Sequence, residues 1–222
     1  MSQLNVTTLK HESAGVDNIT LTSAGITELK ANSSTILTLQ SANGGNADVI
    51  YKDGAGNNKW ITTYRDAGAQ DFWIYSNVRG DGVIKANSAG HVTMPYQPCF
   101  SVKEDGSSSY TNGQYAKLDS IQVNVGGGYN ASTGLFTAPV AGNYLITSQL
   151  MTDANTGRAL YYLYRNGTQY MEASSSSTNY NDAQATTIMY LSAGDTCGIV
   201  IGNGSYYASC NTQNFFCGHL IG

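Results

Sequence analysis

Apolar and polar residues alternate along most of this chain, which is the pattern of half-buried β-strands. The clearest alternating runs are residues 134–137 and 144–151, and the segment APVAG at 138–142 lies between them as a turn. Three later segments repeat the pattern, at residues 159–170, 186–201 and 214–222. No window combines a helical period with capping residues. The second half of the sequence therefore predicts an all-β domain of about eight to ten strands.

Turn signals separate these runs. Asn166-Gly167, between LYYLY and TQYM, is typical of a type I′ hairpin. Ala193-Gly194-Asp195 is a second tight turn. Gly126-Gly127-Gly128 is a loop between strands, because it lacks the lysine and the strand–turn–helix context of a phosphate loop. These turns support a domain built from short consecutive strands.

Residues 46–94 read as a smaller β unit. Trp60 and Trp73, the two tryptophans of the chain, fall within its strands and are predicted to anchor its core. A unit of roughly 50 residues is marginal as an independent core, which favours oligomerisation. Pro95 and Pro98 place the junction with the next domain at 94–98, because each disfavours helix at the residue before it. The five candidate strands are residues 48–51, 59–64, 71–75, 82–85 and 91–94.

Residues 1–45 are rich in Thr, Ser and Asn and carry three short alternating segments, at 19–21, 26–29 and 36–39. Each segment is too short to bury much surface alone, so it needs copies from other chains or a following domain. A stalk or attachment arm that orders on assembly is one interpretation, and a flexible leader is the other. The predicted organisation is an arm at 1–45, a β neck at 46–94 and a head at 95–222.

Charge and composition narrow the class of protein. Only 12% of the residues are charged, the net charge is −4, and 10% are aromatic. Disorder is not expected at this composition, and nothing basic points to nucleic acid as a partner. No apolar run approaches the roughly 20 residues of a membrane helix, so no membrane insertion is expected. The N-terminus lacks the apolar region of a signal peptide, so the chain is expected to stay where it is made or to leave by another route.

No enzyme, cofactor or metal centre is predicted. His11, His91 and His219 are far apart in the sequence, and neither G-x-S-x-G nor H-E-x-x-H occurs. A pair of carboxylates roughly 5–10 Å apart, as in glycosidases, stays open. Residues 153–157 (DANTG) read as a turn rather than a calcium loop, and Arg79-Gly80-Asp81 reads as ordinary turn chemistry. The cysteines at 99, 197, 210 and 217 match no zinc spacing, which leaves free thiols or a disulfide between two of them.

Four motifs of the second half resemble the C1q branch of the C1q/TNF-like jelly rolls. They are STGLFTAPVAGNYLIT at 132–147, LYRNGTQ at 163–169, YLSAGDTCGIVI at 190–201 and FFCGHLIG at 215–222, in the order of that family. The resemblance implies a ten-strand sandwich and a homotrimer. Because some family members bind calcium near the trimer axis, it also leaves room for a structural calcium there, with no ligand assigned.

The first half carries a second resemblance. Residues 5–40 and the run GHVTMPYQPCF at 90–100 resemble bacteriophage tail-fibre and related virion proteins, and no collagen-type Gly-X-Y repeat is present. This implies a virion appendage, made in the host cytoplasm, that joins other tail proteins through its N-terminal region. Its head would bind a host-surface molecule, either a glycan, which is favoured, or a protein. A purely structural fibre tip or trimerisation module is one alternative, and a glycan-hydrolysing tail spike is another.

Two sets of residues are candidates for contacts. Adjacent residues of a strand face opposite sides, so Phe215 and Phe216 are predicted to supply one core side chain and one contact with a neighbouring subunit; burial of both within the monomer is the alternative. Loops rich in Tyr, Ser, Asn and Gly are adaptable recognition surfaces, although they can equally be solvated loops. The ligand-binding candidates from these loops are Tyr110, Asn112, Asn179, Tyr180, Asn203, Tyr206 and Tyr207.

Overall fold

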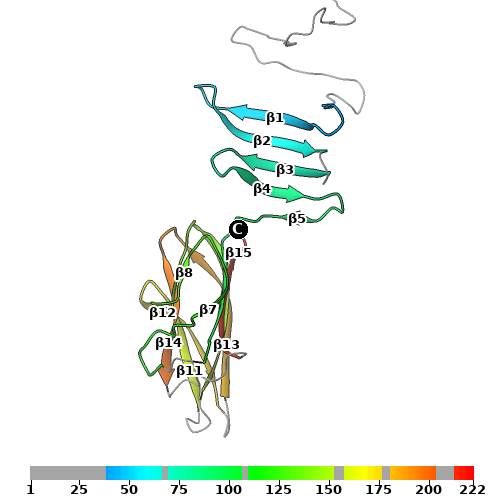
Figure 1. Ribbon diagram of the computed structural model, residues 1–222. Coiled ribbons are helices and arrows are strands. Elements are labelled where there is room, and N and C mark those ends of the chain that lie inside the picture. The colour runs from blue at the N-terminus through cyan, green and yellow to red at the C-terminus, as the bar shows by residue number, and fades with distance from the viewer. Residues whose placement is uncertain (1–38, 67–69, 107–109, 153–157, 177–180, 204–212) are drawn as a thin grey trace, which may run out of the picture.

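A computed structural model describes residues 39–222 apart from 67–69, 107–109, 153–157, 177–180 and 204–212. The described residues form fifteen strands and no helix (Figure 1), as the alternation predicts. Within these ranges, therefore, there is no helix long and apolar enough to cross a membrane. Most of the predicted arm, residues 1–38, lies outside the described residues, so its interpretation as a stalk stays a prediction.

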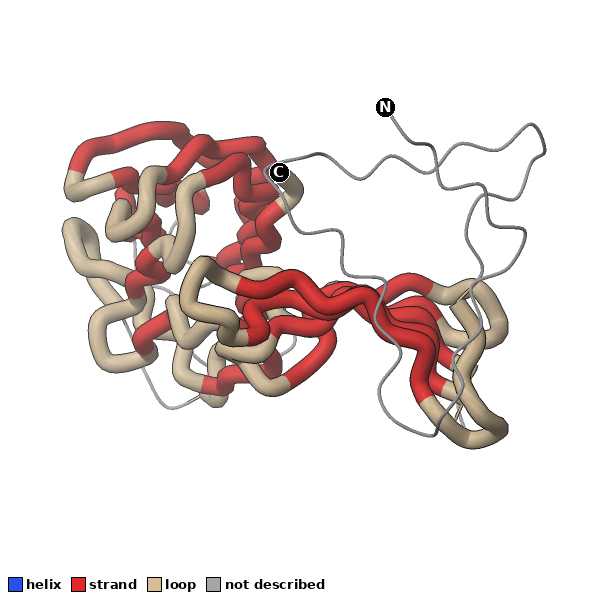
Figure 2. The backbone as a smooth tube through the Cα atoms, turned by 90° about the horizontal axis from the view of Figure 1, so that it is seen from above, coloured by secondary structure: helices blue, strands red, loops and turns tan. Residues whose placement is uncertain are grey.

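The neck is one antiparallel sheet whose strands follow each other in sequence order. In Figure 1 they run across the picture above the head, with β5 nearest to it and β1 farthest from it. Figure 2 looks down onto this stack and shows its strands superimposed as one narrow band, so the neck is a single layer. The strands are β1 (Asn46–Lys52), β2 (Asn58–Arg65), β3 (Asp71–Ser76), β4 (Asp81–Ala86) and β5 (Val92–Thr93).

The prediction that both tryptophans anchor a neck core is wrong. Trp60 is 45% exposed, because no second layer covers its face of the sheet. Trp73 lies on the other face, half buried under Arg65, whose guanidinium carbon is 4.0 Å from the indole centroid, and Lys85, whose Nζ is 4.2 Å from it. These are cation–π contacts between surface side chains. The neck therefore has no closed core of its own among the described residues.

The head is a sandwich of two five-stranded sheets, and its ten strands confirm the predicted jelly roll. We call β13-β10-β15-β6-β7 the front sheet and β12-β11-β14-β9-β8 the back sheet. The strands are β6 (Cys99–Lys103), β7 (Ser120–Val125), β8 (Tyr129–Asn130), β9 (Leu135–Thr137), β10 (Gly142–Thr152), β11 (Ala159–Arg165), β12 (Thr168–Ser175), β13 (Asn181–Leu191), β14 (Thr196–Asn203) and β15 (Phe215–Leu220).

Aromatic side chains fill the space between the two sheets. Phe100 is at the centre: its ring stacks on Phe136 with the centroids 4.5 Å apart, and meets Phe216 edge-on at 4.8 Å. Offset and edge-on pairs at these distances add to the stabilisation from burial. A Cβ on Gly218 would come within 2.4 Å of Phe100 Cε1, so the glycine makes room for this ring. A polar pair deep in the core is satisfied, since Ser148 Oγ and the Tyr161 hydroxyl are 2.9 Å apart.

Two of the predicted turns are tied together by one carboxylate. Asn166 (φ 50°) and Gly167 (φ 74°) form the β11–β12 turn with the positive dihedrals of type I′. The Asp195 carboxylate, from the β13–β14 turn, accepts hydrogen bonds from the Asn166 amide (2.8 Å) and the Arg165 guanidinium (2.9 Å). The bond from Asn166 is the main reason that the pKa of Asp195 lies below its ordinary value, followed by the Ser192 backbone amide.

Residues 94–98 connect the neck to the head and contact both. The Tyr96 hydroxyl donates to Asp81 Oδ2 of β4 over 3.0 Å, which raises the pKa of the phenol. Gln97 donates from Nε2 to the Leu220 carbonyl of β15 over 2.8 Å. Asp81 also pairs with Lys85 at 2.8 Å, so the carboxylate of the Arg79-Gly80-Asp81 sequence is committed to contacts within the chain. The domain boundary itself stays a prediction.

Candidate functional site

The outer face of the front sheet exposes several apolar side chains. Alternate residues of β10 and β13 point away from the core, and Leu145, Ile188 and Tyr190 among them are exposed. Backbone pairing sets Leu145 beside Ile188 on one side and beside His219 on the other. We call the following residues the front face: Cys99, Ser101, Val123, Leu145, Thr147, Ile188, Tyr190, Phe215, Cys217 and His219.

The centre of the front face is hollowed. A shallow depression of about 230 Å³ lies over β6, β10 and β15, and its floor includes Cys99, Leu145, Thr147 and Cys217. None of these ten residues carries a carboxylate or an amino group, and His219 is the single titratable base among them. Two charged residues of the same side of the sheet, Lys103 and Asp182, lie at one end of it. An uncharged, apolar patch of this kind marks an interaction surface more often than a solvated one.

The two adjacent phenylalanines of β15 have different roles. Phe216 is 1% exposed and belongs to the sandwich core, so its prediction as a subunit contact is wrong: the chain's own core already buries it. Phe215 points to the front face and is half buried, paired with Gln149 and Lys103 across the sheet. The structure thus leaves Phe215 as the residue available to a neighbouring subunit.

Three of the four cysteines are described, and all three are free thiols. This confirms the free-thiol interpretation for Cys99, Cys197 and Cys217, while Cys210 lies outside the described residues. Cys217 donates a weak hydrogen bond to the Thr147 carbonyl at 3.5 Å, and burial raises the pKa of its thiol. Cys197 lies in the core, where burial raises the pKa of its thiol from 9.0 to about 12.

We expect the buried Cys197 to make the head sensitive to alkali. Its pKa in the folded state lies above the ordinary value, so its contribution is complete below pH 9 and is lost as the pH rises toward about 12, because only the unfolded chain ionises there. Three pKa units correspond to an upper limit of about 4 kcal/mol. Denaturant unfolding at pH 7 and pH 11 measures the loss. It should shrink in Cys197→Ala relative to Cys99→Ala; equal losses in both variants would contradict this assignment.

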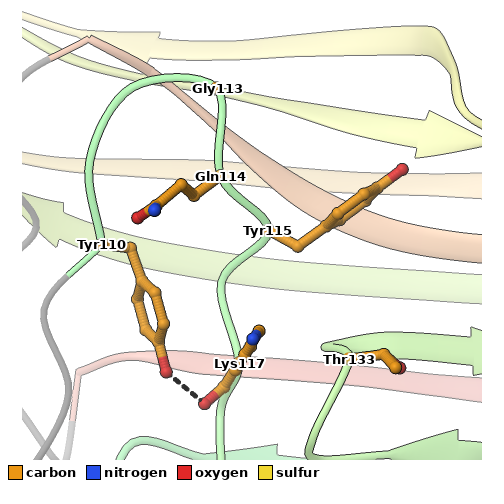
Figure 3. A pocket seen from close by; sticks show the side chains of 6 residues that line it. All are labelled: Tyr110, Gly113, Gln114, Tyr115, Lys117 and Thr133. Atoms are coloured by element: carbon orange, nitrogen blue, oxygen red, sulfur yellow. Dashed lines mark hydrogen bonds between the residues drawn. The ribbon is translucent and has the colours of Figure 1, made fainter.

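The back sheet carries a different surface, where residues 111–117 extend the sheet. The Gly113 amide donates to the Ile201 carbonyl and the Ile201 amide to the Gln114 carbonyl, at 2.8 and 2.9 Å. A pocket of about 410 Å³ lies here, lined by Tyr110, Gly113, Gln114, Tyr115, Lys117 and Thr133 (Figure 3). Figure 3 shows the Tyr110 hydroxyl turned toward the Lys117 carbonyl, which accepts its hydrogen bond at 2.5 Å. Apart from Lys117, no residue that lines the pocket carries a charge.

The candidate ligand residues are only partly brought together. Tyr110 lines this pocket, but it is 7% exposed, its ring packs into the core and its hydroxyl is bonded inside the loop, so its role as a ligand contact stays a prediction. Asn112 and Asn203 are both exposed, and continuing the pairing of Tyr115 with Val200 would set them opposite each other. These two remain predictions. The other four candidates, Asn179, Tyr180, Tyr206 and Tyr207, lie outside the described residues, as does the loop at 153–157.

Three carboxylates meet beside the ends of β6 and β7. Glu104, Asp105 and Asp119 each place one carboxylate oxygen within 4.8 Å of the other two. Glu104 is buried, and the Asp105 amide donates to Asp119 Oδ1 over 3.2 Å. Oxygen donors of this type suit a hard cation such as Ca²⁺, but exposed acidic groups often gather without one. We assign no ion to this group.

Fold and surface together define a two-sheet jelly roll of the C1q/TNF type. The C1q domain family matches residues 99–221, which is more than half of the chain, so the chain belongs to that family. Complement C1q tumor necrosis factor-related protein 3 of mouse is 29% identical over 110 residues, which are 47% of this chain and 43% of that protein. The related protein 2 of mouse is 33% identical over 109 residues, 47% and 37% of the respective chains. This chain therefore spans less than half the length of either relative.

A solved structure agrees on the fold. The Eiger TNF of S. frugiperda covers 57% of this chain and 93% of its own, with a TM-score of 0.50 and 13% sequence identity. At that identity the likeness supports the fold alone. The part of the sequence prediction that named a C1q-like jelly roll is confirmed.

The comparisons overturn the prediction of a phage protein. The relatives are complement C1q tumor necrosis factor-related proteins of mouse and human, not fibres of a virus. The predicted function in host attachment and the predicted location in a virion are therefore wrong. The tail-fibre identity is not shown, and neither tail proteins nor a host glycan has support as a partner. Short Ser/Thr/Asn-rich segments match many unrelated proteins, which explains why they misled the sequence interpretation.

Sequence reasoning missed the front face. Alternation in residues 144–151 predicts that the outward side of β10 is polar, but Leu145 is an apolar residue on that side. Ile188 on β13 and Val123 on β7 are likewise apolar and exposed. Apolar residues at the outward positions of several predicted strands were the sequence signal that could have revealed the front face. The acidic group was missed because Asp119 is fourteen positions from Asp105 and only the β6–β7 connection brings them together.

Proposed function

We propose that this chain is a non-enzymatic C1q-domain protein whose head assembles into a homotrimer through the front face. The observation that carries the proposal is the front face itself, which is apolar at its centre and carries charged groups only at one end of the sheet, at Lys103 of β6 and Asp182 of β13. A monomer would leave this surface in water. Burial of apolar surface stabilises an association by roughly 25 cal/mol per Å², and identical faces with uncharged centres meet there without like-charge repulsion.

Membership of the C1q domain family supports the same assembly. The front sheet has exposed apolar side chains near its centre, at Leu145, and toward both edges, at Val123 and Ile188. This distribution suits a three-fold arrangement. The face of one subunit then packs against the edge of the next, and the ring closes. The back sheet and its loops stay on the outside, where three copies of the same surface would give any weak binding the benefit of multivalency.

The proposal that the protein is not an enzyme rests on the described residues. His91 lies beside Asn87 in the neck, and His219 lies between Leu145 and Cys99 on the front face. The one close group of carboxylates, Glu104 with Asp105 and Asp119, has no histidine or cysteine within it. Nucleophile–base pairs of the kind that enzymes use are not seen in this part of the chain.

Mixed assembly tests the stoichiometry. Full-length chain with and without an affinity tag is produced in the same cells, and native mass spectrometry counts the species. A homotrimer gives four tagged-to-untagged compositions, a dimer gives three and a monomer gives two. Four compositions would support the proposal. Two compositions would overturn it, and three would show that the front face pairs rather than closing a ring.

A further inference from the structure

The neck sheet has one charged face and one apolar face. Strand pairing puts Asp48, Trp73 and Lys85 in one row across the sheet, and Arg65 beside Asp71 in the next row of the same face. In the register of β1 to β5 the opposite face carries one charged residue, Asp81, which lies opposite Ser76 at the start of β4 and is paired with Lys85. We call this opposite face the apolar neck face; its apolar and uncharged residues are Val49, Tyr51, Trp60, Thr62, Tyr64, Phe72, Ile74, Ile84, Ala86 and Val92.

The apolar neck face is too exposed for a stable single layer. Six of its side chains, those of Val49, Tyr51, Trp60, Tyr64, Phe72 and Val92, are between 38% and 63% exposed. Aromatic side chains bring roughly 150–250 Å² each, so the four here leave on the order of 400 Å² of ring surface in water. Monomeric soluble proteins rarely expose contiguous apolar patches of more than a few hundred Å². This face therefore needs a cover.

Identical copies of the neck fit this face better than a charged partner would. The one charged side chain in its register, Asp81, is already paired with Lys85 and Tyr96 of the same chain, so the face offers no unpaired charge for a partner to match. Identical copies can therefore meet on it with little repulsion. Continuity with the head supplies the second argument: residues 94–98 bond to the neck through Tyr96 and to the head through Gln97. Three heads joined at their front faces would hold three necks together at an effective concentration on the order of millimolar.

We propose that the apolar neck face packs against the same face of the neighbouring copies and continues the trimer beyond the C1q domain. This inference rests on the proposed trimer of heads. It assigns to residues 46–93 a role in assembly, although they lie outside the part of the chain that matches the family. The three necks would share one core, which replaces the core that a single neck lacks.

A photo-crosslinker placed on each face of the neck tests this inference on the full chain. Benzoylphenylalanine replaces Tyr64 on the apolar neck face or, as the matched control, Ile50 on the charged face; their exposures are 41% and 43%. Irradiation of the Tyr64 variant is expected to give crosslinked dimer and trimer bands at a yield several-fold above that of the Ile50 variant. Phe72 is the second probe position, in case one variant folds poorly.

The outcomes separate the two proposals, because the native mass of each irradiated sample is measured as well. A trimer mass without excess crosslinking at Tyr64 and Phe72 overturns the neck inference and leaves the trimer of heads standing. A monomer mass overturns both. Crosslinks that join Tyr64 only to residues 1–38 of the same chain would show that the N-terminal arm covers this face, which also overturns the inference.

Discussion

Phe216→Ala is expected to cost the head about 3–5 kcal/mol of folding free energy, the usual loss for a buried phenylalanine. The side chain is 1% exposed and meets Phe100 edge-on at 4.8 Å. Its removal leaves a cavity at the point where both sheets contact each other, and Phe100 and Tyr129 lose a ring neighbour. Urea unfolding of both proteins at one chain concentration measures the change, because the stability of an assembly depends on concentration.

Phe215→Ala is the matched control for this prediction, since it removes the same atoms from the next residue of the same strand. Phe215 lies on the front face and outside the core cluster. Its loss should therefore affect assembly more than the folding of a single chain. A Phe215→Ala variant that unfolds as readily as Phe216→Ala would show that the two side chains do not divide between core and surface.

Leu145→Arg is expected to convert the homotrimer into monomers while leaving the head folded. Leu145 lies at the centre of the front face, and its cross-strand neighbours Ile188 and His219 offer no negative charge to the new guanidinium. An unpaired charge at a closed interface costs several kcal/mol, and each trimer would contain three of them. Size-exclusion chromatography with light scattering reports the assembly, and circular dichroism reports the fold.

Val140→Arg is the control for the charge itself. Val140 is 44% exposed, close to the 39% of Leu145, but it lies in the turn before β10 and outside the front face. This variant should keep the mass of the unmodified protein. If Leu145→Arg also keeps that mass, the front face is not the contact between subunits, whatever the oligomeric state.

Local patterns in the sequence were sufficient to predict the strands and the turns. Residues 144–151 alternate because β10 lies between core and surface, and Asn166-Gly167 takes positive dihedrals that few other pairs accept. Such features depend on neighbours in the sequence. The five neck strands were predicted within a few residues for the same reason.

Which face of a strand is covered cannot be read from the strand itself. Trp60 looks like a core residue in sequence, but its cover would have to come from another sheet or another chain. Tyr110 looks like a recognition residue among Ser and Asn, yet its ring completes the sandwich core. Phe215 and Phe216 could be separated only once β15 was placed between β10 and β6. Long-range packing decided all three cases, and local patterns do not encode it.

The mass of the full chain in solution tests the central claim most directly. Light scattering across a hundredfold range of concentration, at low and at high salt, should give three times the chain mass of 23.6 kDa. The mass should not fall at high salt, because an interface that is uncharged at its centre has little electrostatic attraction to screen. A mass of one chain at every concentration would contradict the account, since the front face would then be exposed to water without a partner.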